Sequence, residues 1–540
     1  MKQWVFKMTF KEALKNEQDK VVIIALATLM KQQSCLIKCI ALPGCGKTTT
    51  LLKATKVAMS KIKNLYALYL AYNNSIADEG RTKFPKRVDV RTINSYSRGY
   101  ISRLFPQVNT RNIRNLKSTD IKKRYSTDFK VAKSVLGLFV NYCKDAETNL
   151  DKYLKINAAG TAESNYVKDI WNKMRTGEVV CTHDFYFKLF ANALVEKQVT
   201  IKELDLLLFD EAQDANPIAL QIFYAIPAKV KIIAGDKHQR IYSFNKSVNA
   251  LLKKGKDSKV KEYTCFLTKT FRFQKNIGDK ANKILQFFKG ETNRIVCADI
   301  VKKYPPEYIN TRAFISRTNS ELIKKMISCV ENDEVFITTR NPEEMFALIE
   351  DVSNLILGKK QLVKNYTVRD ANSIEELKTH AADAEDVNLT QAIKIAEKEH
   401  EHISDLKKKA LLYFEDKDNK YRKRDHLVLS TAHSCKGLEF DEVTIAGDFP
   451  DFAKIIHKLG YKSYENFLDN VADSNDSQID EINLFFVALT RAIKTVSVRS
   501  VNNIYLGMNR EMDVANEVNS KLEKFWKSKK RGAKWKRRVA

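Results

Sequence analysis

The sequence is poor in the residues that build flexible or cross-linked proteins. Glycine (17) and proline (9) are scarce among 540 residues, which argues against long flexible linkers. The nine cysteines show no paired short spacings and do not describe a disulfide framework. The longest largely apolar run, residues 21–30, is too short to cross a bilayer, and the N-terminus lacks a signal-peptide stretch. These absences predict a soluble intracellular protein of the cytoplasm or nucleus, with no membrane partner.

Positive charge, by contrast, is abundant. The chain carries 93 Lys and Arg against 65 Asp and Glu, a net charge of +28. A surplus of this size favours a polyanionic partner, and nucleic acid is the commonest. Residues 343–418 run against this trend with 17 acidic and 11 basic residues, whereas residues 521–540 hold ten basic residues and one acid. We therefore expect a solvated acidic helical segment and a basic tail. The tail either grips nucleic acid through cations and tryptophans, is only solvated, or is a nuclear-import signal.

Short apolar runs alternate with helix-like segments along most of the chain. The runs lie at residues 36–40, 65–70, 206–209, 230–234, 427–429 and 443–446. This alternation predicts parallel sheets covered by helices, which is an α/β fold. Residues 91–184 and 341–423 break the alternation and are expected to be helical, with helices at 373–382 and 389–414.

Residues 41–48 (ALPGCGKT) form a phosphate-binding loop with alanine in place of its first glycine. The loop follows a strand-like run and precedes a helix-like one at residues 49–59. Glycines let backbone N–H groups turn toward phosphate oxygens, and the start of the helix adds the positive end of its dipole. We expect Lys47 to reach the β- and γ-phosphates of a nucleotide and Thr48 to bind Mg²⁺.

A second apolar run ends in residues 210–214 (DEAQD). A buried strand would deliver two carboxylates to its carboxyl end. We expect Asp210 to hold Mg²⁺ through its water shell and Glu211 to orient and deprotonate an attacking water. Lys47 and Asp210 are 163 residues apart, which is more than a compact P-loop domain requires. Residues 91–184 are therefore expected to be an insertion.

Residues 210–214 resemble the second motif of the UvrD/Rep/PcrA group of superfamily 1 DNA helicases. Further segments resemble the other motifs of that group in the expected order, at residues 72–73, 92–95, 235–242, 267–273, 431–440 and 487–492. Within the group, His238 before Gln239, residues 182–186 and the helical segment 375–412 are most similar to the F-box DNA helicase branch. Because the nucleotide site starts near the N-terminus of this sequence, we expect no F-box before it and a compact relative of that branch.

The resemblance implies two RecA-like P-loop lobes of α/β class, each with a helical insertion, and ATP in the cleft between them. Arginines of the second lobe could reach the nucleotide only when the lobes close, so hydrolysis would be coupled to lobe motion. The expected boundaries are residues 1–90 and 185–268 for the first lobe, 91–184 for its insertion, 269–340 and 424–505 for the second lobe, 341–423 for its insertion and 506–540 for the basic tail.

The resemblance also implies a role for each residue of the nucleotide site. Thr48 and Asp210 would hold Mg²⁺. Guanidinium groups can bind the charge of the transferring phosphoryl group in a bidentate manner. The residues expected to act in hydrolysis are Lys47, Asp210, Glu211, Gln239, Arg272 and Arg491. Those expected to contact the nucleotide are Gln18, Pro43, Gly44, Cys45, Gly46, Lys47, Thr48, Thr49, Phe271 and Glu439.

Recognition of adenine leaves alternatives open. Gln18 resembles the upstream glutamine that reads the adenine edge, although its spacing of 29 residues from Lys47 is long. Gln32 and Gln33 are rivals. Phe271 stands where the family places an aromatic ring that stacks on adenine, and its alternative role is core packing.

The resemblance places further residues near single-stranded DNA or near its coupling to ATP. Stacking aromatic rings suit a motor that must tolerate any sequence, because every base has a π-face. Asn94 departs from the histidine that is usual in the family, although its amide can still donate a hydrogen bond. The residues expected to contact DNA are Tyr72, Asn73, Thr92, Asn94, Tyr242 and His433.

Together these features predict an ATP-dependent helicase or translocase on single-stranded DNA, with 3′→5′ polarity implied by the resemblance. Its partners would be single-stranded DNA, junctions with duplex, and proteins of replication or recombination. Three alternatives remain. They are a translocase that strips proteins or recombination filaments with little unwinding, an RNA helicase, and a nucleic-acid-binding scaffold with a dead ATPase.

Overall fold

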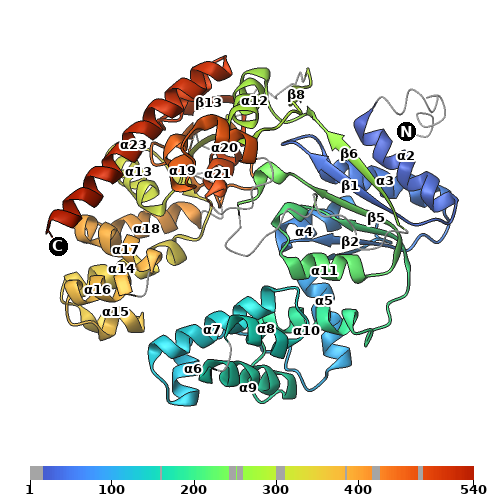
Figure 1. The fold of residues 1–540 in the computed structure, drawn as a ribbon, viewed down its shortest axis with the longest axis horizontal. Coiled ribbons are helices and arrows are strands. Elements are labelled where there is room, and N and C mark those ends of the chain that lie inside the picture. Colours follow the sequence, from blue (N-terminus) through green and yellow to red (C-terminus); the bar gives the residue numbers. More distant parts are fainter. Residues whose placement is uncertain are drawn as a thin grey trace. The chain divides into compact units, whose positions relative to one another are not determined.

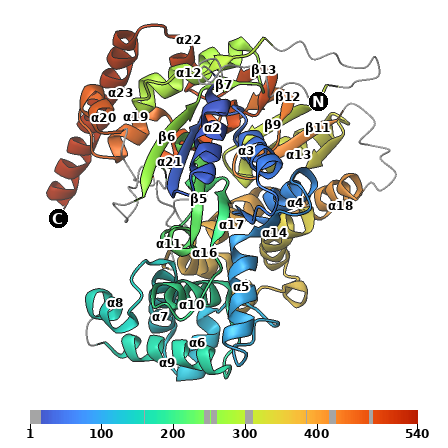
Figure 2. The same cartoon turned by 90° about the vertical axis from the view of Figure 1, so that its right-hand side faces the viewer.

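A computed structural model describes residues 16–158, 161–241, 251, 260–299, 310–383, 386–415, 426–471 and 478–539, without the side chains of residues 383, 387 and 528–539. The chain divides into two compact units, Met1–Thr270 and Phe271–Ala540. Each unit contains a parallel β-sheet flanked by helices (Figure 1 and Figure 2). The α/β fold expected from the alternation of apolar runs and helices is therefore confirmed.

The first unit is built on a six-stranded parallel sheet with the order β3-β2-β4-β5-β1-β6. Its central strands are buried on both faces, which explains why they read as continuous apolar runs. The strands are β1 (Cys35–Ala41), β2 (Ala67–Ala71), β3 (Asp89–Thr92), β4 (Leu204–Phe209), β5 (Ala228–Gly235) and β6 (Lys261–Leu267).

Helices of two kinds belong to the first unit. Those beside the sheet are α2 (Glu17–Met30), α3 (Lys47–Lys61), α4 (Asn74–Lys83) and α11 (Pro217–Ala225), with the 3₁₀ turns η1 (Ala212–Asp214) and η2 (Lys237–Gln239). Those between β3 and β4 are α5 (Ile93–Leu104), α6 (Ser118–Tyr125), α7 (Phe129–Lys144), α8 (Leu150–Asn157), α9 (Ala162–Thr176) and α10 (His183–Val195). The second set shares one apolar core with the sheet, in which Phe190 and Phe139 join Leu68 and Phe209. This continuous core ties the long inserted segment to the sheet.

The second unit contains a five-stranded parallel sheet with the order β10-β11-β9-β12-β13. Its strands are β9 (Arg312–Ser316), β10 (Phe336–Thr338), β11 (Leu427–Thr431), β12 (Phe440–Ile445) and β13 (Ala492–Val498). Helices α12 (Lys275–Lys289), α13 (Asn319–Glu331), α19 (Phe452–Lys458), α20 (Tyr464–Val471), α21 (Ile479–Leu489) and α22 (Asn503–Gly507) accompany it. Two further two-residue strands are described, β7 (Lys269–Thr270) at the end of the first unit and β8 (Val296–Cys297) in the second.

Helices also fill the chain between β10 and β11. They are α14 (Pro342–Ile356), the 3₁₀ turn η4 (Lys360–Leu362), α15 (Tyr366–Asp370), α16 (Ile374–Asp383), α17 (Val387–Glu399) and α18 (Ile403–Phe414). The prediction of one continuous helix over residues 389–414 is wrong, because the chain turns at residues 400–402 and forms two helices. The break lets α17 and α18 each pack on α14, so that a short bundle buries Phe346, Ile393 and Leu406.

The chain ends in the long helix α23 (Glu511–Val539). Val514, Val518 and Leu522 recur at four-residue spacing and are fully buried, so one face of the helix packs on the unit, mainly on α19. The Nζ of Lys521 donates to Asp451 at 2.9 Å. The described first half of α23 is therefore an integral part of the second unit. Within the described residues, no helix is long and apolar enough to span a membrane.

Candidate active site

The phosphate-binding loop lies between β1 and α3. Gly44 and Gly46 have φ values of 72° and 79°, in the left-handed region that favours glycine. The backbone angle of Gly46 therefore favours glycine, and a Cβ there would also push away the Nε2 of Gln18, which lies 2.6 Å from that position. Gly46 is the N-cap of α3 and offers no side chain to the first N–H groups of that helix. These N–H groups and the helix dipole suit the loop to bind phosphate.

The strand β4 delivers Asp210 to the same place. One carboxylate oxygen, Oδ2, accepts from the hydroxyl of Thr48 at 2.6 Å and from the hydroxyl of Tyr69 at 3.0 Å. The other oxygen accepts from the backbone N–H of Glu211 at 2.9 Å. The Nζ of Lys47 lies 3.4 Å from Oε1 of Glu211. Four residues expected from two motifs are thus brought together in one unit.

The electrostatics of this cluster follow from its burial. Burial raises the pKa of Asp210 and the charge of Glu211 raises it further, whereas Lys47 and the hydroxyl of Thr48 act in the opposite direction. Burial and the adjacent Asp210 also raise the pKa of Tyr69. Two carboxylates with one lysine leave an excess of negative charge, which a divalent cation would neutralise. The hydroxyl of Thr48 and the carboxylate of Asp210 are hard oxygen ligands of the kind that Mg²⁺ prefers, so the donor set fits that ion.

A chain of hydrogen bonds extends from Glu211 across the edge of the sheet. The side-chain amide of Gln213 donates to Glu211, and its carbonyl oxygen accepts from the backbone N–H of Asp236 at 3.0 Å. The carboxylate of Asp236 then accepts from the amide of Gln239 at 2.8 Å. A Cβ on Gly235 would lie 2.6 Å from Gln213 Oε1, so a larger residue there would displace this side chain. Gln239, expected from its motif, is therefore connected to Glu211 by two residues to which the sequence assigned no role.

The first turn of α2 lies against the phosphate-binding loop. The side chain of Gln18 donates from Nε2 to the carbonyl oxygen of Cys45 at 3.2 Å. Gln32 and Gln33 follow the far end of this 14-residue helix, about 20 Å away along its axis. Of the three glutamines considered for adenine, only Gln18 has a described contact with the loop.

The second unit brings its own expected residues together. Nε of Arg272 donates to Oε1 of Glu439 at 2.6 Å, and Nη1 donates to the carbonyl oxygen of Thr490 at 3.3 Å. Arg491 is buried, with Nε donating to Val487 O at 3.0 Å. Its Nη1 donates at 3.4 Å to the carbonyl oxygen of Leu438, which is the residue before Glu439. Phe271, which precedes Arg272, leaves 49% of its surface exposed.

Four of the residues expected to contact DNA lie at one edge of the first sheet. Tyr72 and Asn73 follow β2, whose last residue Ala71 pairs with Thr92 at the end of β3, and Asn94 lies in the first turn of α5. Asn73 caps α4 by accepting from Ile76 N at 2.9 Å, and Thr92 caps α5 by accepting from Ser95 N at 3.0 Å. These two side chains therefore have local structural roles in this structure, whereas Asn94 is exposed and Tyr72 is half-buried.

The remaining two residues expected to contact DNA lie elsewhere. His433 follows β11 in the second unit and is half-buried. Tyr242 lies outside the described residues.

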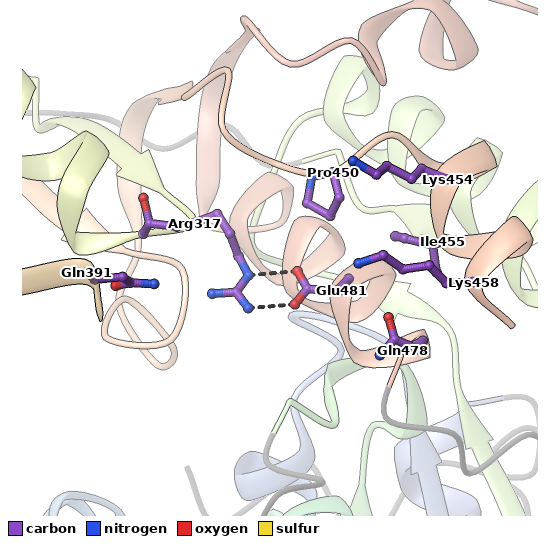
Figure 3. A pocket seen from close by; sticks show the side chains of 9 residues that line it. Arg317, Gln391, Pro450, Lys454, Ile455, Lys458, Gln478 and Glu481 are labelled. Atoms are coloured by element: carbon purple, nitrogen blue, oxygen red, sulfur yellow. Dashed lines mark hydrogen bonds and ion pairs between the residues drawn. The ribbon is translucent and has the colours of Figure 1, made fainter. Parts of the chain in front are cut away.

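A cationic hollow of about 320 Å³ opens in the second unit (Figure 3). Arg317 lies in the turn after β9 and forms a two-pronged ion pair with Glu481, with distances of 2.7 Å from Nε and 2.5 Å from Nη2. The carboxylate of Asp448 accepts from the backbone N–H groups of Arg317 and Thr318 at 2.8–3.1 Å and fixes the turn. Gln391, Pro450, Ile455 and Gln478 also line the hollow.

Two lysines add positive charge to the rim of this hollow. Lys454 and Lys458 are exposed and lie one helical turn apart on α19, and neither has an ion-pair partner in the part of the chain that the structure describes. Sequence reasoning missed Arg317 and both lysines. The i, i+4 spacing of the lysines was the available signal, but only the fold places them opposite Arg317.

Comparisons with known proteins agree with this architecture. A sequence profile of the UvrD-like helicase C-terminal domain matches residues 79–502. The chain is 27% identical over 497 residues to F-box DNA helicase 1 of Gallus gallus, with 85% of this chain and 47% of the relative covered. It is 25% identical over 512 residues to F-box DNA helicase protein 1 of Schizosaccharomyces pombe, with 85% and 55% covered. The chain thus spans about half the length of these relatives. The resemblance stated from the motifs is confirmed, and the chain belongs to the UvrD-like helicase family.

Proposed function

We propose that the protein is an ATP-dependent DNA helicase that moves along single-stranded DNA with 3′→5′ polarity. The observation that carries the proposal is the convergence of Lys47, Thr48, Asp210 and Glu211 behind a glycine-bearing loop. This is the arrangement that a hydrolase of nucleoside triphosphates needs. The family and the names of the two relatives, both DNA helicases, support DNA as the track.

In this proposal each side chain has one task. The loop and Lys47 bind the phosphates of ATP, and Glu211 orients the attacking water and accepts its proton. Thr48 and Asp210 would hold Mg²⁺, which supplies positive charge to the phosphate oxygens. Arg272 and Arg491 stabilise the charge of the transferring phosphoryl group. Gln18 reads the adenine edge.

The domain division remains part of the proposal. Residues 1–90 with 185–268, and residues 269–340 with 424–505, act as two RecA-like lobes that close and open with each ATP. Residues 91–184 and 341–423 act as accessory insertions.

The proposal is tested by the nucleic acid that stimulates hydrolysis and by the substrate that is unwound. ATP hydrolysis should rise on adding single-stranded DNA and much less on adding RNA of the same length. Partial duplexes with a 3′ single-stranded tail should be unwound, and those with only a 5′ tail should not. Unwinding confined to 5′-tailed duplexes would show the opposite polarity. Stimulation of ATP hydrolysis by RNA alone would show that the protein moves along RNA and not DNA.

A second candidate is a translocase that strips proteins or recombination filaments from DNA with little unwinding. It is favoured by the small size of the bundle between β10 and β11, which spans residues 342–414. A filament-displacement assay beside the unwinding assay separates the two. Displacement without unwinding would select the second candidate.

The cationic hollow gives a prediction about DNA binding. Replacing Lys454 and Lys458 together by glutamine should weaken single-stranded DNA binding. The slope of log K against log salt should become shallower by up to about 1.4, because each lost phosphate contact removes about 0.7. The matched control replaces Lys408 and Lys409, which are exposed on α18. Equal weakening in both variants, measured by fluorescence anisotropy over a salt series, would contradict a role for this hollow.

The packing of α23 refines the role of the basic tail. Ending the chain after Lys527 removes seven Lys and Arg residues and no acid, and it leaves Lys521, Leu522 and Trp526 in place. DNA affinity and its salt slope should fall, with DNA-free ATP hydrolysis and the unfolding midpoint unchanged. Ending the chain after Ser520 should also lower stability, by about 2 kcal/mol or more, because the buried Leu522 is lost. Identical behaviour of the two truncations in DNA titration and thermal unfolding would contradict this division.

A further inference from the structure

The first turn of α2 holds two elements of the nucleotide site. Asn16 caps the helix by accepting from the backbone N–H groups of Gln18 and Asp19 at 3.0 and 3.4 Å. The cap fixes the direction of each side chain that follows. Gln18 then donates to the carbonyl oxygen of Cys45 in the phosphate-binding loop, and Asp19 forms an ion pair with Lys53 on α3. The turn is thus joined to the loop and to the helix behind it.

Glu17, in the same turn, holds a third segment that is 251 residues away in sequence. Its Oε1 accepts from the hydroxyl of Thr268 at 2.6 Å, and its Oε2 accepts from the backbone N–H of Thr268 at 2.6 Å and of Lys269 at 3.3 Å. Both carboxylate oxygens are therefore used in charge-assisted hydrogen bonds, which are among the stronger kind. An amide in place of the carboxylate would lose the charge and turn an NH₂ group toward one of these donors.

Thr268 and Lys269, the segment held by Glu17, lie where the chain leaves the first unit. This segment begins directly after β6, whose last residue, Leu267, accepts from the backbone N–H of Leu42 at 2.9 Å. It ends at the boundary between Thr270 and Phe271. With Lys269 held, the backbone of Phe271 can lie no more than about 7 Å from it, because two residues span at most that distance.

We propose that Glu17 is a positioning residue for ATP binding, which acts by fixing Thr268 and Lys269 and thereby the backbone that presents the ring of Phe271 to the nucleotide. The inference rests on the proposed function and on the expectation, stated from the sequence, that Phe271 stacks on adenine. Arg272 donates hydrogen bonds to Glu439 and Thr490 within the second unit, so its position depends less on Glu17 than that of Phe271 does. The effect of Glu17 therefore falls on nucleotide binding more than on the chemical step.

The experiment measures KM for ATP and kcat at saturating single-stranded DNA. Glu17→Gln should raise KM about fivefold and change kcat less than twofold, as expected for coupled neighbouring groups. Thr268→Val, which removes the hydroxyl donor from the opposite side, should act in the same direction. The matched control is Glu203→Gln, an exposed carboxylate before β4 that has no role in the site or the held segment, and it should leave KM unchanged.

A second comparison separates positioning from a general structural role. In a Phe271→Ala background, Glu17→Gln should produce no further rise in KM, because the ring that it positions is absent. An equal rise in both backgrounds, or an unchanged KM in both Glu17→Gln and Thr268→Val, would overturn the inference. Absence of ATP hydrolysis in the unmodified protein would instead contradict the proposed function.

Discussion

Replacing Lys47 by alanine is expected to lower DNA-stimulated ATP hydrolysis by about a hundredfold to a thousandfold. The Nζ of Lys47 lies in the phosphate-binding loop, 3.4 Å from Glu211. Its loss removes the cation that would meet the β- and γ-phosphates, and it also leaves Glu211 and the buried Asp210 without the positive charge between them. Burial and the charge of Glu211 already raise the pKa of Asp210, and removing Lys47 would raise it further.

Phosphate release, measured with and without single-stranded DNA, tests this expectation. The matched control is Lys56→Ala, further along α3, where the lysine is exposed. That variant should keep the rate of the unmodified protein. Full activity in Lys47→Ala would show that ATP is hydrolysed at another place in the chain.

Replacing Glu211 by glutamine should lower kcat by about a hundredfold to ten-thousandfold with ATP binding preserved. Glutamine keeps the shape of the side chain and can still accept the hydrogen bond from Gln213. It cannot accept a proton from an attacking water at neutral pH. The loop and Lys47, which bind the phosphates, are left in place.

The split between binding and turnover distinguishes this variant from Lys47→Ala. Binding should be followed with a fluorescent ATP analogue, and turnover by single-turnover hydrolysis. The exposed Glu203→Gln, before β4, is the control for loss of one negative charge. Loss of nucleotide binding equal to the loss of turnover would mean that Glu211 maintains the fold of the site and does not activate water.

The fold could be predicted from the sequence where strands are buried on both faces. The runs before Pro43 and Asp210 are such strands, and they were found as β1 and β4. The four edge strands of the two large sheets, β3, β6, β10 and β13, were not among the apolar runs. β3 and β6 show why. β3 has only four residues, and in β6 polar residues interrupt the apolar ones, as is common in edge strands. β9 was also missed, although it is as long as β2 and β11, which were found.

The candidate site shows the same division at the level of side chains. Residues within a motif could be assigned because short spacing fixes their chemistry, as with Lys47 and Thr48. Contacts between distant segments could not, because only the folded sheet sets them. Tyr69 bonds to Asp210 across 141 residues, and Arg317 pairs with Glu481 across 164 residues. Sequence reasoning therefore identified the reacting groups but missed the side chains that hold them.

The position of β1 in its sheet has a consequence for synthesis of the protein. β1 is residues Cys35–Ala41, but its two neighbours are β5 and β6, which end at Gly235 and Leu267. At ribosomal rates of about 5–20 residues per second, roughly 10–50 s pass between the synthesis of β1 and of its last partner. Until β5 is made, both edges of β1 lack their final hydrogen bonds, and until β6 is made the phosphate-binding loop cannot be anchored to it. The first unit should therefore fold late during translation and be the part of the chain that most needs protection from aggregation.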